Sequence, residues 1–142
     1  MDETTIKLRV RYAETDQMGR AHHAHHLVWA EAGRTAWLRE RGTSYAELER
    51  RGVYLPVSRV EVDYRRGVGF DQVVRVATWP EAVRSRRITF GYRITGGGDD
   101  DLVAELVTDL VCVDAERRVR RIPDDVLRTL AGDGTGDDPD RA

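Results

Sequence analysis

Alternating apolar and polar positions predict strands over much of the chain. In the first such run, residues 6–12, Ile6, Leu8, Val10 and Tyr12 share one face, which is typical of a half-buried strand. Further runs predict strands over these ranges: 53–66, 72–79, 87–95 and 102–113. Pro80 predicts a bend after residue 79, and the run Ala115-Glu116-Arg117-Arg118 predicts a hairpin turn that returns through residues 119–122.

The spacing becomes helical between the first two predicted strands. It predicts a long helix over residues 23–41, which the pair Arg41-Gly42 would end. The predicted apolar stripe consists of Ala24, Leu27, Val28, Glu31, Thr35 and Leu38, with Glu31 as its odd member. Ser44 with Glu47 matches a capping box, so a short helix is predicted over residues 45–51. Pro123 predicts the start of another short helix.

This order of elements indicates an α+β protein in which a helix packs on one face of an antiparallel sheet. The chain has 142 residues, which suits one domain, and we expect that domain to cover residues 1–130. The Gly/Asp-rich residues 131–142 are expected to be disordered.

Composition narrows the class of protein. No apolar run approaches the length of a bilayer span and the N-terminus is polar, so we expect neither a membrane span nor a signal peptide, and a cytoplasmic location. The single cysteine, Cys112, excludes an internal disulfide and lies in an apolar run, which predicts a buried thiol. A net charge of −2 without a basic aromatic platform argues against nucleic-acid binding.

Arginine supplies nearly all the positive charge, since Lys7 is the only lysine among 23 basic residues. The arginines cluster at Arg65-Arg66, at Arg84 with Arg86-Arg87, and at Arg117-Arg118 with Arg120-Arg121. The forked guanidinium donors suit phosphate, although clusters of this kind are usually solvated faces.

The residues with the clearest chemistry lie between the first strand and the long helix. Glu14 and Asp16 form an acidic loop, with Gly19 close behind, a few residues ahead of the helix N-terminus. Unpaired N–H groups and a partial positive charge at that terminus suit an oxyanion, so a carboxylate there could help to split an acyl bond. The alternative is that Asp16 is only a turn or cap residue. We expect Glu14 to be exposed or paired with an arginine, and Glu31 to be buried with a partner.

All four histidines lie in the segment His22-His23-Ala24-His25-His26. His22 and His26 have helical i,i+4 spacing, but a metal site needs a further ligand cluster that the sequence lacks. We therefore expect no metal and no other cofactor. His23 is expected to line the site and the other histidines to lie on the surface or at an interface. Trp29 and Trp37, on the long helix, are expected to pack in the core or at an interface.

The chain resembles the hotdog-fold thioesterases of the 4-hydroxybenzoyl-CoA thioesterase and YbgC-like acyl-CoA thioesterase group. The matching segments are Arg11 to Asp16 with Gly19, His23-Ala24, Leu27-Val28-Trp29 with Glu31, Tyr64-Arg65-Arg66 and Phe70-Asp71. The resemblance implies an antiparallel sheet wrapped round a long central helix. It also implies a homodimer or homotetramer with the site between subunits, and hydrolysis of acyl-CoA or acyl-carrier-protein thioesters without a metal.

Residue by residue, the resemblance assigns catalysis to Asp16 as nucleophile or general base and to the backbone N–H of His23. It assigns substrate binding to Tyr12, Gly19 and Glu31, and contacts with the CoA phosphates to Arg84, Arg86 and Arg87. The chain departs from the family pattern at His22, at His25-His26 and at Gly67, which bears on acyl specificity. The alternatives are a catalytically silent hotdog protein that binds acyl-CoA or a protein partner, and, less well matched, a hydratase.

Overall fold

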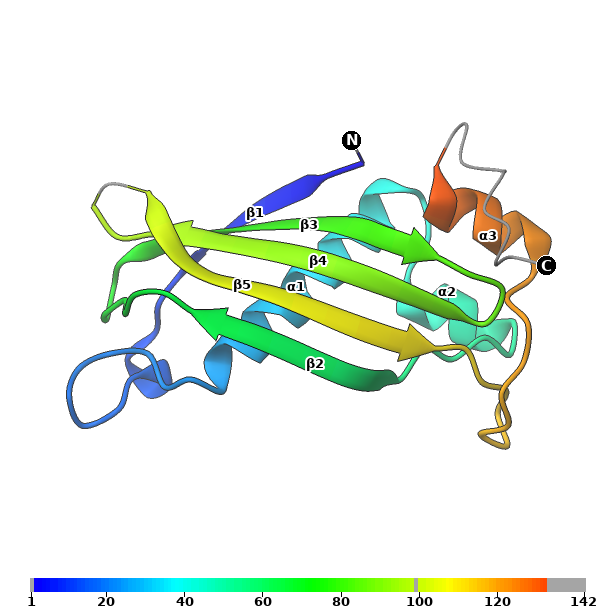
Figure 1. The fold of residues 1–142 in the computed structure, drawn as a ribbon, viewed down its shortest axis with the longest axis horizontal. Coiled ribbons are helices and arrows are strands. Elements are labelled where there is room, and N and C mark those ends of the chain that lie inside the picture. The colour runs from blue at the N-terminus through cyan, green and yellow to red at the C-terminus, as the bar shows by residue number, and fades with distance from the viewer. Residues whose placement is uncertain (1, 99, 133–142) are drawn as a thin grey trace.

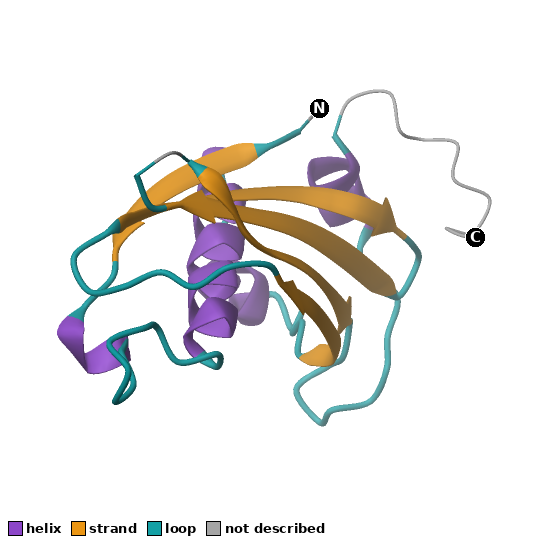
Figure 2. Ribbon diagram, turned by 60° about the vertical axis from the view of Figure 1, so that its left-hand side comes forward, coloured by secondary structure: helices purple, strands orange, loops and turns teal. Residues whose placement is uncertain are grey.

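A computed structural model describes residues 2–98 and 100–132 of the chain. This part contains one five-stranded antiparallel sheet, in the order β1-β3-β4-β5-β2. The strands are β1 (Thr4–Arg9), β2 (Val57–Tyr64), β3 (Val73–Val83), β4 (Arg87–Gly96) and β5 (Asp101–Val111). The sheet curves around the long helix α1 (His25–Glu40), which lies against its concave face (Figures 1 and 2). The predicted α+β arrangement is confirmed.

Three shorter helical segments complete the fold: η1 (Tyr12–Glu14), α2 (Tyr45–Arg50) and α3 (Asp124–Ala131). At the start of α2 the Ser44 hydroxyl accepts a hydrogen bond from the Glu47 backbone N–H at 3.1 Å, so Ser44 is the N-cap that the sequence predicts. The predicted tail, residues 131–142, lies largely outside the described residues, and its first residue, Ala131, belongs to α3.

The apolar stripe predicted for the long helix is wrong except at Leu38, which is buried. Leu27 and Val28 are exposed by 39% and 51%, and Glu31 is also exposed. The buried face instead holds His26, Trp29, Ala30, Gly33, Arg34, Trp37 and Leu38. The two tryptophans supply the largest apolar area, which orients the helix toward the sheet, and their packing in the core is confirmed.

Gly33 lets α1 approach the sheet closely. A Cβ atom at this position would lie 2.4 Å from the Thr78 hydroxyl and 3.0 Å from Val76 Cγ1, both on β3. Because those distances leave no room for a methyl group, any larger residue here would push the helix off the sheet.

A buried arginine also fixes α1 in place. Arg34 donates from Nε to the Tyr45 hydroxyl at 2.8 Å and from Nη1 to the Tyr92 hydroxyl at 3.1 Å. The Tyr92 hydroxyl in turn shares a 2.6 Å hydrogen bond with Thr108. This network joins α1 to α2, β4 and β5, and it supplies the polar partners that a buried guanidinium requires.

Two turn predictions need correction. Strand β3 continues through Pro80 to Val83, and the register shifts between Pro80 and Ala82, so the expected bend is a bulge within the strand. The residues after the turn at 115–118 form only an isolated bridge between Val113 and Val119, not a strand. Cys112 is buried, as predicted.

Candidate functional site

Asp16 lies on a short loop that is closed by the bridge between Thr15 and Ala21. Its backbone N–H donates to the Arg20 carbonyl at 2.7 Å. Its Oδ1 atom accepts from the N–H groups of Met18 at 2.9 Å and Arg20 at 3.2 Å. Asp16 therefore shapes the turn through one carboxylate oxygen. In the described part of the chain, nothing donates to its second oxygen, Oδ2, and the residue is exposed.

Gly19 closes this loop with a positive φ of 77°. A side chain is strained in that conformation, which explains why glycine occupies the position next to the candidate catalytic residue. The structure therefore shows a conformational role for Gly19, which is to let the Asp16 loop turn.

Glu14 fastens the loop to α1. Its carboxylate accepts from the Arg11 backbone N–H at 2.8 Å and from the Trp29 indole Nε1 at 3.0 Å, while its backbone carbonyl accepts from the His22 N–H at 2.8 Å. Glu14 is only 4% exposed, so the expectation of an exposed carboxylate is wrong, although the expected pairing with an arginine exists at 3.5 Å to Arg11. Burial opposes the charge, but the donors outweigh it and lower the pKa of Glu14.

The start of α1 offers backbone N–H groups beside this loop. Helix α1 begins at His25, and its N-cap residue is Ala24. The alanine side chain cannot accept a hydrogen bond from the first backbone N–H groups of the helix. The His22 ring accepts from the Ala24 N–H at 3.2 Å, and the His22 carbonyl accepts from the His25 N–H at 3.0 Å. Within the described residues nothing accepts a hydrogen bond from the His23 N–H, which leaves it available to a substrate carbonyl.

Tyr64, at the end of β2, holds this turn from the other side. Its hydroxyl donates to the His23 carbonyl at 2.7 Å, and its ring lies 4.9 Å from the ring of His26. The opposite side of His26 contacts Trp29 at a centroid distance of 4.8 Å. His26 is buried, so its expected surface position is wrong, and burial lowers its pKa.

The structure places the predicted substrate-binding residues Tyr12 and Glu31 in different parts of the molecule. Tyr12 is 77% exposed and packs edge-on against Phe70 at 5.8 Å, next to the Asp16 loop. Glu31 is exposed on α1, so the expectation that its carboxylate is buried with a partner is wrong. Together these observations define a site in which the Asp16 carboxylate, the His23 N–H and the Tyr12 ring belong to one end of the molecule.

Comparison with known proteins gives the family. Residues 10–130 match the thioesterase-like superfamily. The chain belongs to this superfamily. It is 36% identical over 110 residues to the putative acyl-CoA thioesterase YneP of Bacillus subtilis, which covers 78% of this chain and 79% of that protein.

Solved structures agree with this assignment. The hypothetical protein TT1821 from Thermus thermophilus superposes with a TM-score of 0.84 and 38% identity, covering 89% of this chain and 96% of that one. The 4-hydroxybenzoyl-CoA thioesterase of a Pseudomonas strain superposes with a TM-score of 0.81, covering 89% and 98%; at 19% identity it shows the fold alone. The predicted hotdog fold and thioesterase family are confirmed.

The arginines predicted to meet CoA lie far from Asp16 within this thioesterase. Arg84, Arg86 and Arg87 surround the turn between β3 and β4, beside a hollow of about 570 Å³ that Ser85 and Val111 also line. The Asp16 loop lies near the other end of the sheet (Figure 1). The ten residues of β4 alone span roughly 33 Å, so one chain does not bring these arginines to its own Asp16.

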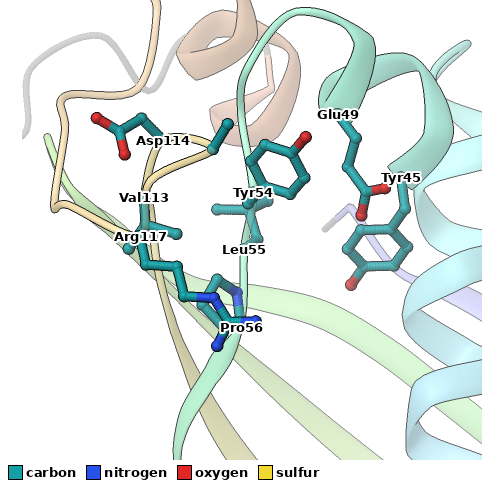
Figure 3. A pocket seen from close by; sticks show the side chains of 9 residues that line it. Tyr45, Glu49, Tyr54, Leu55, Pro56, Val113, Asp114 and Arg117 are labelled. Atoms are coloured by element: carbon teal, nitrogen blue, oxygen red, sulfur yellow. The ribbon is translucent and has the colours of Figure 1, made fainter.

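Another pocket of the thioesterase, of about 560 Å³, lies between α2, residues 53–56 and the turn at residues 113–117. Tyr45, Tyr54 and Leu55 form one wall, and the Arg117 side chain extends from the opposite turn toward Pro56 (Figure 3). None of the residues predicted for catalysis lines this pocket.

The histidine segment does not form a metal site with other residues of the described ranges, in which no group of three or more His, Cys, Asp or Glu side chains is arranged to hold an ion. In the same ranges, none of the helices of the thioesterase is long and apolar enough to cross a membrane.

Proposed function

We propose that the chain hydrolyses the thioester of an acyl-CoA or an acyl-carrier protein to a free acid and a thiol. The observation that supports this proposal is the unused hydrogen-bonding capacity on either side of the loop: within the described residues nothing donates to Asp16 Oδ2, and nothing accepts from the His23 N–H at the start of α1. The name of its relative in Bacillus subtilis, a putative acyl-CoA thioesterase, supports the same substrate class.

The thioester makes a carboxylate sufficient for this reaction. In one route Asp16 Oδ2 attacks the carbonyl carbon, the carbon–sulfur bond breaks, and water then opens the mixed anhydride. In the other route Asp16 takes a proton from the attacking water. The thiolate leaves readily because the pKa of a free thiol is only roughly 8.5. In both routes the carbonyl oxygen gains negative charge, which the His23 N–H and the helix N-terminus stabilise.

The second candidate is a silent hotdog protein that binds acyl-CoA without cleaving it. Retention of the acid at position 16, placed beside an available N–H group, favours the enzyme. Thiol release should be measured over a panel of alkyl and aryl CoA thioesters and carrier-protein thioesters, with a chelator present. The proposal expects turnover of at least one substrate; binding without release by any member of the panel would favour the silent protein.

We propose further that the protein is a homodimer or homotetramer. The edge strand β2 exposes Val57, Val60 and Tyr64 by 39–48%, and Leu27 and Val28 on α1 are also exposed. Helix α1 packs mainly on β1 and β3, which leaves the β2 side of the concave face uncovered (Figure 2). A second copy that covers this apolar edge would remove it from water and close the site beside Tyr64.

The dimer gives a direct prediction. Sedimentation of the wild-type chain should show at least two copies, and Val60→Lys should shift it toward the monomer and lower turnover at least tenfold. Lys7→Ala, on the opposite edge strand β1, is the matched control and should change neither. A stable, fully active monomer near 16 kDa would contradict the proposed assembly.

The arginines of the β3–β4 turn give a second prediction. In the proposed assembly these arginines would meet CoA bound at the Asp16 site of another subunit. Arg84→Ala, Arg86→Ala and Arg87→Ala should each raise KM for a CoA thioester severalfold and leave kcat nearly unchanged, because contacts with CoA phosphates act equally on ground and transition states. A pantetheine thioester, which lacks the nucleotide, should be unaffected. Arg128→Ala, exposed on α3, is the control. An equal rise in KM with both substrates, or no rise with either, would contradict the proposed contact with CoA and would indicate that these arginines are ordinary solvated surface residues.

A further inference from the structure

Two sequence motifs without a role in the proposed chemistry meet beside the Asp16 loop. Arg66, from the Arg65-Arg66 cluster, and the turn at residues 96–98 line a pocket of about 280 Å³ together with Arg20, Gln72 and Asp101. Arg20 follows Gly19 on the loop that carries Asp16. The pocket therefore adjoins the candidate site within one chain.

The placement of Arg20 is specific. Its backbone holds the Asp16 turn, and its side chain lies across two glycines. A Cβ atom on Gly67 would lie 3.3 Å from Arg20 Cδ, and one on Gly69 would lie 3.7 Å from Arg20 Nη1. In the described part of the chain the Arg20 guanidinium has neither a hydrogen bond nor an ion pair. A positioned guanidinium without a protein partner can bind a planar or tetrahedral oxyanion.

The other polar groups of the pocket suit the same ligand. Gln72 Oε1 accepts from the Gly69 N–H at 2.7 Å, which leaves the amide NH2 of Gln72 free to donate. Arg66 pairs with Asp101, but these side chains are 56% and 44% exposed, so solvent screens the pair and weakens it. Two arginines and one aspartate thus line the pocket, and an incoming anion can compete with Asp101 for Arg66.

Distance identifies the part of the substrate that reaches the pocket. The Arg20 backbone N–H lies 3.2 Å from Asp16 Oδ1, and an arginine side chain is roughly 7 Å long, so the guanidinium lies at most about 10 Å from Asp16 Oδ1. The first phosphate of a pantetheine thioester lies more than a dozen bonds from the sulfur, roughly 16 Å when extended. The pocket thus lies within reach of the far end of a medium-length acyl chain, and the pantetheine arm would have to bend to bring its phosphate there.

We propose that this pocket selects acyl groups that end in a carboxylate, and that Arg20 is the residue that binds this carboxylate. The inference rests on the proposed hydrolysis at Asp16 and names the substrate class of that site.

The test compares suberoyl-CoA, whose acyl chain ends in a carboxylate, with octanoyl-CoA, which has the same length and a methyl end. Wild type should prefer suberoyl-CoA in kcat/KM by up to about fivefold, because Arg20 is exposed and solvent screens a charged pair of this kind. Arg20→Ala should bring the ratio close to one by raising KM for suberoyl-CoA. Arg65→Ala is the control, because Arg65 is exposed, pairs with Glu105 and does not line the pocket, and it should keep the preference.

The same comparison with pantetheine thioesters separates the acyl carboxylate from the CoA phosphates. A loss of affinity in Arg20→Ala for both CoA thioesters, but for neither pantetheine thioester, would overturn the proposal and assign Arg20 to phosphate. The lack of any wild-type preference would also overturn it. The dissociation constants of suberoyl-CoA and octanoyl-CoA should also be measured with Asp16→Asn, which binds without turnover. This measurement tests the pocket by itself, so a wrong assignment of the pocket can be told apart from a wrong assignment of the hydrolysis.

Discussion

Asp16→Ala is expected to lower kcat by at least about a thousandfold, because removal of a nucleophile or general base typically costs that much or more. The variant should also lose a little stability, about 1 kcal/mol, since Asp16 Oδ1 no longer accepts from Met18 and Arg20. Thiol-release kinetics and urea denaturation measure the two effects separately.

The matched control for this variant is Asp125→Ala. Asp125 is 57% exposed on α3 and pairs with Arg51, so its loss tests a surface aspartate that has no connection with the site. We expect turnover to stay within about twofold of wild type in this control. Near-normal turnover in Asp16→Ala would contradict the proposed role of Asp16 as nucleophile or general base.

Glu14→Ala is expected to destabilise the fold by about 2–4 kcal/mol, because it leaves the Arg11 N–H and the buried Trp29 indole without an acceptor. Turnover should fall as well, since Glu14 joins the Asp16 loop to α1. Urea denaturation gives the stability change. Glu116→Ala, which removes a 65% exposed glutamate side chain, should change stability by less than about 0.5 kcal/mol.

A double-mutant cycle with Trp29→Phe tests the bond itself. If Glu14 acts through the indole N–H, the two substitutions should be less than additive by about 1 kcal/mol or more; strict additivity would contradict this. Glu14→Gln gives the pH dependence. The folded-state pKa of Glu14 lies below its ordinary value of 4.5, so the advantage of wild type should be complete above pH 4.5 and should shrink as pH falls through that lowered pKa.

The strands were predictable because most of them have one face toward the core. The alternation at residues 87–95 identifies β4 to within a residue, and the capping box at Ser44 identifies the start of α2. The long helix was predictable in extent but not in orientation. Its buried face includes the charged Arg34 and the small Gly33, whose partners, Tyr92 and Thr78, come from distant strands. Apolar spacing along the helix cannot reveal such partners.

The candidate site was predictable only where local chemistry defines it. The Asp16 turn and the helix start follow from nearby residues, and the structure contains both. Glu14, His26 and Tyr64 were misjudged or missed because their environments depend on contacts across the chain. The one local signal was the tryptophan at position 29, whose buried indole needs an acceptor. Sequence spacing also could not reveal that the Arg84 turn lies at the other end of the sheet.

The most direct test of the account separates binding from chemistry in Asp16→Asn. Asparagine keeps the turn, since its side-chain oxygen can still accept from Met18 and Arg20, but its amide is a poor nucleophile and base. Single-turnover thiol release and the dissociation constant should be measured for one thioester that wild type hydrolyses. The account predicts a dissociation constant within a few fold of wild type and a chemical step slower by about a thousandfold or more. A chemical step close to that of wild type would contradict the central role of Asp16.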